Sequence, residues 1–373
     1  MSVICNSTPR LDGLHMPAEF EEQEQIWMLW PTRPDNWRDG AKPAQQAFAQ
    51  VANAIAQFEP VTICVPADQY TNCRNMVGKG VRVLEMSAND AWMRDCGPTF
   101  VINDKGDIRG VDWDFNAWGG LVDGLYFPWD QDQLVAQKVC EAERIDRYRT
   151  KDFVLEGGSI HTDGEGTLLT TEMCLLSEGR NPHMNKEQIE HMLGEYLAVD
   201  KVIWIKDGID PEETNGHVDD IACFIRPGEV ACLWTQDKAD PFYEQCQQAY
   251  ETLAAATDAR GRRLKVHKLC TTRRPVTIQG EFRIDAVEGT LPRRDGDICI
   301  TSYMNFLIVN GGVIVPQYDD ENDALALSEV RAMFPERKVV GVHTREIVYG
   351  GGNIHCVTQQ QPRRAIRGIE DNG

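Results

Sequence analysis

The hydrophobic pattern of this chain repeats along its length. A short apolar run is followed by a segment with apolar residues at helical spacing, and then by another short apolar run. In the first round the run 26–30 ends at Pro31, the segment 44–58 has helical spacing, and 61–65 is again apolar. Runs of this length, alternating with amphipathic helices, predict an α/β protein.

The same order returns until there are about five rounds, at intervals of roughly 60–80 residues. No two rounds share obvious sequence, so what repeats is the architecture. Asn310-Gly311-Gly312 and Pro227-Gly228 each predict a hairpin turn between two apolar runs. Further strands are predicted at 81–86, 100–102, 108–115, 167–171, 201–205, 221–225, 230–234, 265–269, 303–309, 313–315 and 338–342, and further helices at 69–77, 132–142, 186–196, 241–257 and 323–333.

The sequence contains no linker rich in glycine, serine or proline that would separate two domains. We therefore expect residues 1–373 to form one domain of mixed α/β units arranged radially. Residues 1–25 are polar and predict an irregular segment, of which 1–20 would form an N-terminal arm. The polar tail 363–373 is predicted to be mobile.

Composition narrows the range of partners. The net charge of -20 argues against a nucleic-acid ligand and suits a cationic substrate. The longest apolar runs, such as 306–309, are far too short to span a membrane, so no membrane partner is expected. Twelve cysteines without a Cys-x-x-Cys pair, and an N-terminus without a secretory signal, predict a cytoplasmic protein with reduced thiols.

The most unusual stretch is Gly350-Gly351-Gly352, which is followed closely by Cys356. Consecutive glycines let a backbone bend sharply or approach a ligand closely. A cysteine that follows such a loop is a candidate nucleophile, because thiolate is a strong nucleophile near neutral pH. The alternative is a tight turn followed by a buried, inert cysteine.

Two carboxylates also lie beside turn sequences. Asp95 follows Trp92 at a predicted loop, where it could hold a cation against a flat aromatic wall; the alternative is an ordinary turn residue. Glu156 ends an apolar strand immediately before Gly157-Gly158, which places a carboxylate where a loop can open.

His217 and Asp219 form the third polar group. Being two residues apart, they would point to the same side of an extended segment, as an acid/base pair requires. A hairpin turn with solvated acids is the alternative interpretation. A metal site is possible, but no further ligands follow with the usual spacing. Ser159 and His161 could form a serine hydrolase pair, although no third member is evident.

Together these residues predict one site at the centre of a radial fold. Several carboxylates around a thiol raise its pKa, and a bound cation lowers it again. A planar, positively charged electrophile such as a guanidinium group fits this arrangement, because carboxylates bind its N–H groups in pairs.

At these residues the sequence resembles the agmatine deiminase family, of the peptidylarginine-deiminase type, within the guanidine-modifying (pentein) superfamily. The resemblance covers most of the chain. It implies a five-bladed α/β propeller of pseudo-fivefold ββαβ modules that hydrolyses agmatine to N-carbamoylputrescine and ammonia without a metal or organic cofactor. The shared runs are 27–31, 33–38, 92–95 with Gly97 and Pro98, 156–161, 215–219 and 350–356.

The resemblance also implies residue roles. Cys356 would attack the guanidinium carbon and form a covalent thiouronium intermediate. His217 would protonate the departing ammonia and then activate water. Asp95 and Asp219 would hold the guanidinium nitrogens, with Glu156 as a third acid that holds substrate and orients His217.

The amine end of the substrate is less defined by the sequence. Agmatine has no carboxylate, so acids or aromatic side chains should line that end of its pocket. The candidates for that end are Trp92 and Glu213, with Trp118 and Gly352 as further lining. By analogy with such enzymes, we expect a homo-oligomer, a dimer or tetramer.

Other functions stay open at this point. An arginine or peptidyl-arginine deiminase would need Arg94 or Arg33 to reach the α-carboxylate. A propeller without catalytic activity could bind polyamine-like cations, although a binding protein needs no thiol. A serine or metal hydrolase would respond to serine reagents or chelators.

Overall fold

The strands of the chain form five small sheets in a computed structural model that describes residues 1–210, 212–279 and 282–364. Two sheets have four strands and three have three. The strands are β1 (Val3–Ile4), β2 (Gln23–Leu29), β3 (Val61–Val65), β4 (Val81–Glu85), β5 (Thr99–Ile102), β6 (Ile108–Asp114), β7 (Asp146–Val154), β8 (His161–Thr162), β9 (Thr167–Thr171), β10 (Lys201–Ile205), β11 (Ala222–Arg226), β12 (Glu229–Trp234), β13 (Lys265–Cys270), β14 (Leu307–Val309), β15 (Gly312–Gln317), β16 (Lys338–His343) and β17 (Thr358–Pro362).

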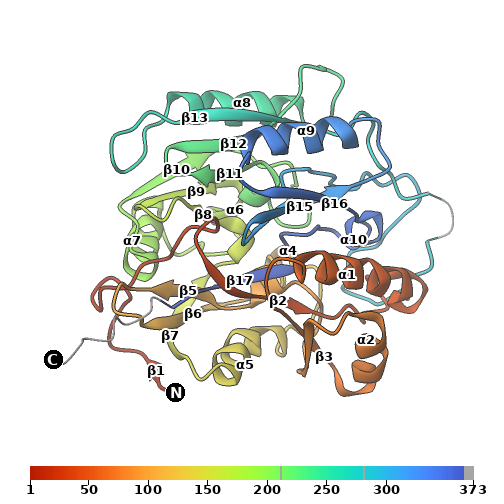
Figure 1. The fold of residues 1–373 in the computed structure, drawn as a ribbon, viewed down its shortest axis with the longest axis horizontal. Helices are drawn as coiled ribbons and strands as arrows, with labels where there is room; N and C mark the ends of the chain where they lie inside the picture. Colours follow the sequence, from red (N-terminus) through yellow and green to blue (C-terminus); the bar gives the residue numbers. More distant parts are fainter. Residues whose placement is uncertain (211, 280–281, 365–373) are drawn as a thin grey trace.

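Each sheet contains the same ββαβ unit. Two strands pair antiparallel, a helix follows, and the next strand returns parallel to the second, as in β5-β6-β7, β8-β9-β10, β11-β12-β13 and β14-β15-β16. A parallel return needs such a crossover. In the remaining unit, which is the first along the chain, the C-terminal β17 pairs antiparallel with β2, which closes the ring (Figure 1). The predicted fold class, a five-bladed α/β propeller, is confirmed.

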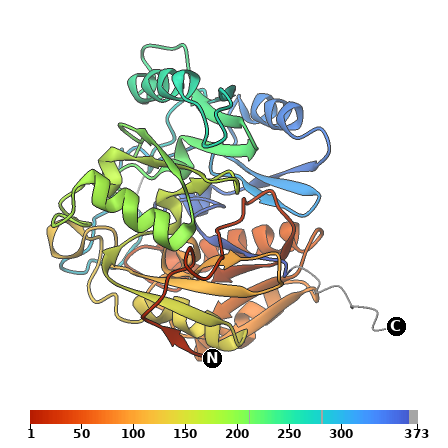
Figure 2. The same cartoon turned by 90° about the vertical axis from the view of Figure 1, so that its left-hand side faces the viewer.

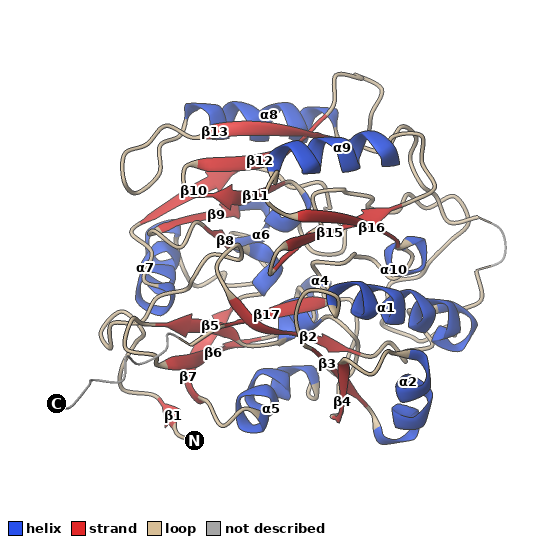
Figure 3. Cartoon of the chain, viewed as in Figure 1, coloured by secondary structure: helices blue, strands red, loops and turns tan. Residues whose placement is uncertain are grey.

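The crossover helices pack against their own sheets, and several also pack against the neighbouring sheet (Figure 3). Each buries one apolar face, as Ile189, Leu193 and Leu197 show. The helices are α1 (Lys42–Ile55), α2 (Tyr70–Met76), α3 (Met93–Cys96), α4 (Gly120–Asp123), α5 (Val135–Ala142), α6 (Glu172–Leu175), α7 (Lys186–Leu197), α8 (Tyr243–Ala255), α9 (Asp323–Met333) and α10 (Arg345–Val348). None of the helices in the described ranges is long and apolar enough to cross a membrane.

The N-terminal segment differs from its prediction as an irregular arm. It contains β1, which pairs with β7, and the first residues of β2, and it runs across the molecule between them (dark red in Figure 2). Gln23 and Gln25 are polar but buried, because their side-chain amides bond to other buried groups. Gln23 Nε2 donates to the Glu19 carbonyl at 2.6 Å, and Gln25 Nε2 to Gln361 Oε1 at 3.0 Å.

Most predicted elements agree with the structure to within a few residues. The strand predicted at 303–309 is shorter, because its first residues form a turn before β14. Four strands were not predicted, namely the short β1 and β8, most of β7 and the glutamine-rich β17. Most of the predicted tail 363–373 lies outside the described residues; Arg363, its first residue, bonds to the Glu22 carbonyl at 2.9 Å.

Candidate active site

Each of the five units presents a polar residue shortly before its first strand. The positions are equivalent in the ββαβ repeat, so the residues converge on the centre of the ring although they are distant in sequence. They are Asp95 before β5, Glu156 before β8, Asp219 before β11, Asn305 before β14 and Cys356 before β17. The repeat therefore assembles the predicted constellation and adds Asn305 to it.

Cys356 is buried at the centre of the ring. Asn305 Nδ2 donates to its Sγ at 3.1 Å, and Asp219 Oδ2 lies 3.7 Å from the same sulfur. Burial, with the charges of Asp219, Asp220 and Asp95, raises the pKa of the Cys356 thiol well above its usual value. The thiol is therefore protonated in the free protein, and a cation beside these acids would favour the thiolate.

Asp95 belongs to the short helix α3 rather than to the predicted loop. Its Oδ1 accepts from the Gly158 backbone N–H at 3.0 Å, and its Oδ2 accepts from the Trp118 indole N–H at 2.9 Å. Burial, with the nearby charges of Asp219 and Glu156, raises the pKa of Asp95 to about 6, although His217 opposes this.

Glu156 forms an ion pair with Arg180, whose Nε lies 2.7 Å from Oε1, and neither side chain is exposed. Burial would raise the pKa of Glu156, but the charges of Arg180 and His217 hold it below its usual value. Arg180 itself is fixed by Thr214 O at 2.9 Å and Asn215 Oδ1 at 2.7 Å. Glu156 is thus held as a carboxylate by Arg180 and His217.

His217 lies between two of these acids. Its Nδ1 is 3.9 Å from Asp95 Oδ1, and its Nε2 is 3.9 Å from Glu156 Oε2. Within the described part of the chain, neither nitrogen has a hydrogen-bond partner, so both can serve a substrate or water. Burial lowers the pKa of His217, but Asp95 and contacts with Cys174 and Glu156 raise it well above its usual value overall.

The predicted extended segment between His217 and Asp219 is wrong. Asn215 and Gly216 have positive φ values of 57° and 77°, and they turn the chain into a 3₁₀ helix at Val218–Asp220. The side chains of His217 and Asp219 nevertheless face one space, beside Gly158.

Gly158 marks the point where three groups meet. A Cβ on this glycine would lie 2.5 Å from His217 Nδ1, 2.9 Å from Asp95 Oδ1 and 3.0 Å from Asp219 Oδ2. No side chain fits there, so glycine permits the imidazole and the two carboxylates to approach one another.

A pocket leads from the surface to Cys356 at this centre. Trp92 stacks on Trp37 with ring centroids 5.5 Å apart, and Asp90 accepts both indole N–H groups, at 3.0 and 2.7 Å. The lining contains several acids and aromatics, and Cys356 forms its end. The lining residues include Asp35, Asp90, Trp92, Asp95, Trp118, Tyr126, Glu213, Arg33, Arg293 and Cys356.

Glu213 lines this pocket and is paired with Arg293, which the sequence did not single out. Arg293 Nη2 donates to Glu213 Oε2 at 3.1 Å and to the Gly350 carbonyl at 2.8 Å. A Cβ on Gly351 would lie 1.7 Å from Glu213 Oε2. Gly352 stands behind the lining, where a Cβ would meet the Trp92 ring at 2.5 Å.

Several other predictions can be compared with these positions. Arg94 is buried outside the pocket lining and donates to the His355 carbonyl and to Gln360, whereas Arg33 lines the pocket and pairs with Asp35 at 2.9 Å. The Ser159 hydroxyl donates to the Glu156 carbonyl at 2.6 Å, and His161 faces Glu19.

Three groups of potential metal ligands lie close together in the described residues. They are Glu19, His161 and His355; Glu156, Cys174 and His217; and Asp219, Asp220 and Cys356. Cys356 of the third group lines the pocket described above, and the second group contains His217 and Glu156 of the candidate site.

Comparison with known proteins agrees with this geometry. The sequence model of the family described as Porphyromonas-type peptidyl-arginine deiminase matches residues 15–362. An agmatine deiminase of Pseudomonas aeruginosa is 58% identical over 358 residues, which cover 95% of this chain and 97% of that protein.

Solved structures agree as well. The agmatine deiminase of Enterococcus faecalis is 67% identical, with a TM-score of 0.97 over 98% of this chain and 100% of that one. That of C. jejuni is 26% identical, with a TM-score of 0.77 over 94% and 96%. The chain therefore belongs to the agmatine deiminase family, within the Porphyromonas-type peptidyl-arginine deiminase family.

Proposed function

We propose that this protein hydrolyses agmatine to N-carbamoylputrescine and ammonia at the pocket that ends at Cys356. The observation that supports this most directly is the convergence of one thiol, one imidazole and three carboxylates, with Gly158 between them. A guanidinium carbon is a weak electrophile, and it needs a strong nucleophile together with acids that bind its N–H groups. The named relatives are agmatine deiminases.

Cys356 would act as the nucleophile. Binding of the cation between Asp95 and Asp219 lowers the pKa of the thiol, whose proton passes to a neighbouring carboxylate or to solvent. The thiolate forms a C–S bond to the guanidinium carbon, and the C=N electron pair moves to nitrogen. His217 donates its proton to the departing nitrogen. Ammonia is released, and the substrate carbon remains bound to Cys356 as a covalent thiouronium.

The second half releases the product. Neutral His217 takes a proton from water, which attacks the same carbon. The C–S bond then breaks to return the thiolate, and the second proton of the water passes to solvent as the ureido carbonyl forms. Glu156, held as a carboxylate by Arg180, orients His217 and stabilises its protonated form. The net reaction consumes one water and produces ammonia and the ureido product.

The pocket chemistry favours agmatine over arginine. An α-carboxylate needs an unpaired cation, but both arginines among the described lining residues are paired, Arg33 with Asp35 and Arg293 with Glu213. Glu213 and the face of Trp92 suit the terminal amine instead. Trp118 supports Asp95 through its indole N–H, and Gly352 leaves room for the Trp92 ring.

The test is ammonia release by the purified protein, with agmatine and L-arginine compared side by side and EDTA added in parallel. We expect release from agmatine alone, unchanged by EDTA and abolished in Cys356→Ala. Release from arginine would overturn the pocket assignment, and full activity of Cys356→Ser would overturn the covalent scheme.

A further inference from the structure

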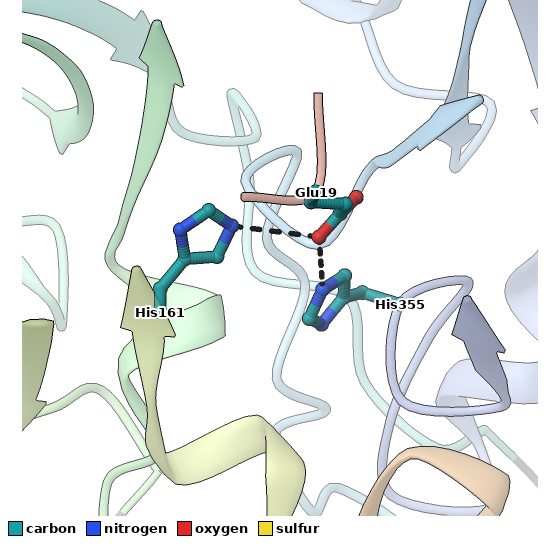
Figure 4. A group of neighbouring side chains, drawn as sticks. All are labelled: Glu19, His161 and His355. Atoms are coloured by element: carbon teal, nitrogen blue, oxygen red, sulfur yellow. Dashed lines mark hydrogen bonds and ion pairs between the residues drawn. The ribbon is translucent and has the colours of Figure 1, made fainter. Parts of the chain in front are cut away.

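A second buried network contains His355, the residue before the nucleophile (Figure 4). It consists of Glu19, His161 and His355, which come from the N-terminal segment, the third unit and the nucleophile loop. Glu19 Oε2 lies 2.8 Å from His355 Nε2 and 3.4 Å from His161 Nε2. None of the proposed catalytic steps uses these three side chains directly.

The network reaches the reacting atoms through one more contact. Nδ1 of His355 lies 2.8 Å from Oδ2 of Asp219, and the same oxygen lies 3.7 Å from Sγ of Cys356. A continuous chain of side chains therefore runs from Glu19 through His355 and Asp219 to the thiol.

The hydrogen-bond partners fix the protons on both imidazoles. Carboxylates only accept, so the two nitrogens of His355, which face Asp219 and Glu19, both carry hydrogen, and His355 is an imidazolium. The Phe224 backbone N–H donates to His161 Nδ1 at 3.2 Å, so His161 Nε2 carries the hydrogen toward Glu19. That proton occupies the lone pair a metal would need, so a proton-bearing network fits better than a metal site.

The groups around His355 act on its pKa in opposite directions. Burial and the charge of Arg94 oppose the charge of His355, whereas Glu19 and Asp219 favour it, and the pKa of His355 is raised overall. The pKa of Glu19 shifts in the opposite direction. Burial would raise it, but His355 and His161 hold it well below its usual value. Glu19 and His355 are thus a buried ion pair.

Glu19 is also fixed in position. Its second oxygen, Oε1, accepts the Ile308 backbone N–H at 2.7 Å at the start of β14. The N-terminal segment therefore places a carboxylate at the centre of the ring rather than covering its surface.

We infer that Glu19 is a positioning residue of the reaction, which acts through His355 to keep Asp219 ionised and directed at the guanidinium group beside Cys356. Without the carboxylate of Glu19, His355 loses one of the two charges that hold its proton. A neutral His355 can donate to Asp219 but no longer offsets its charge. The inference rests on the proposed function for the identity of the group that Asp219 binds.

The test compares Glu19→Gln, which keeps the size and removes the charge, with Glu59→Gln. Glu59 is a matched control, because it is also buried, bonds to Asn310 Nδ2 at 2.8 Å and has a pKa raised by burial to about 8, so it is already neutral at pH 7. Protonation of His355 is followed by NMR of protein labelled with ¹⁵N-histidine, with His355→Gln used for assignment. This measurement needs no substrate, so it is independent of the proposed function.

In Glu19→Gln we expect His355 to lose its proton at least about one pH unit lower than in wild type. Turnover of agmatine should fall about tenfold near pH 8 and recover in part toward pH 6.5, as His355 regains its proton, with a smaller change in KM. Glu59→Gln should match wild type in both measurements. Unchanged titration of His355, or unchanged turnover despite a shifted titration, would overturn the inference. If Glu19→Gln fails to fold, Glu19→Asp, one methylene shorter, must shift both measurements in the same direction.

Discussion

Arg180 and Glu156 form an ion pair, Nε to Oε1 at 2.7 Å, in which neither side chain is exposed to solvent. The pair keeps a carboxylate charged at a place where burial alone would neutralise it. It also explains why Glu156 can face His217 as an anion without contact with water.

The first prediction concerns this pair. Arg180→Met should lower the free energy of unfolding by about 3–5 kcal/mol, because it leaves a buried carboxylate without its partner. The control is Lys186→Met, which breaks a half-exposed pair with Glu172 and should cost at most about 1 kcal/mol. Urea denaturation of both variants measures the difference.

The pH dependence of that loss has a definite sign. In wild type the pKa of Glu156 is lowered in the folded state, so its contribution to stability is present above the unfolded value and is lost as pH falls through the folded one. In Arg180→Met burial dominates and raises that pKa, so the variant should lose stability as pH rises from 5 to 8. Equal losses at both pH values would contradict this account.

The second prediction concerns the acid limb of activity. Asp95 must be ionised to hold a guanidinium, and burial raises its pKa to about 6, so kcat/KM should fall as pH decreases through 6. Trp118→Phe removes an N–H that stabilises the charged form and should move this limb up by about one pH unit. In the control Trp113→Phe, the lost bond is to Thr99 at 2.9 Å, and the limb should not move.

The third prediction tests the amine end of the pocket. Gly351→Ala places a Cβ where Glu213 Oε2 now lies, so KM for agmatine should rise roughly tenfold, whereas kcat should change little. Gly311→Ala is the control, because its φ of +69° is also positive but no atom lies within 4 Å of the new Cβ. Both variants place a side chain at a positive φ, but only the Cβ at Gly351 would meet other atoms, those of Glu213 and Arg293.

The fourth prediction concerns the thiol. Chloroacetamidine is a cation and chloroacetamide is neutral, and both alkylate thiols. Asp95 and Asp219 should attract the cation and favour the thiolate, so Cys356 should prefer chloroacetamidine by a factor on the order of ten to a hundred. Mass spectrometry can compare this preference with that of the exposed Cys5 in the same sample. An equal preference at the two cysteines would count against the cation-binding role of the acids.

Sequence patterns predicted the repeating units because their strands are apolar and their crossover helices are amphipathic. They failed at β17 and at the start of β2, where buried glutamine side chains form hydrogen bonds with one another inside a sheet. Trp27 Nε1, for example, donates to Gln361 Oε1 at 2.8 Å. A buried polar strand of this kind has no hydrophobic signature, because its burial depends on partners more than 300 residues away.

The candidate site was predicted where residues stood beside glycines or turns. Asn305 had no such signal, although its place before β14 matches that of Cys356 before β17. Arg180, Arg293 and Glu19 were missed for a different reason. Each acts by pairing with a distant charge, and a pairing of that kind is visible only when the chain is folded.

Closure of the ring has a consequence for biosynthesis. The sheet that contains β2 is complete only when β17 joins it, and Cys356 stands two residues before that strand. During synthesis the first unit must therefore wait for the last part of the chain. The nucleophile is made at almost the same moment as the strand that completes the sheet, so a nascent chain that ends earlier has neither a closed ring nor a reactive thiol.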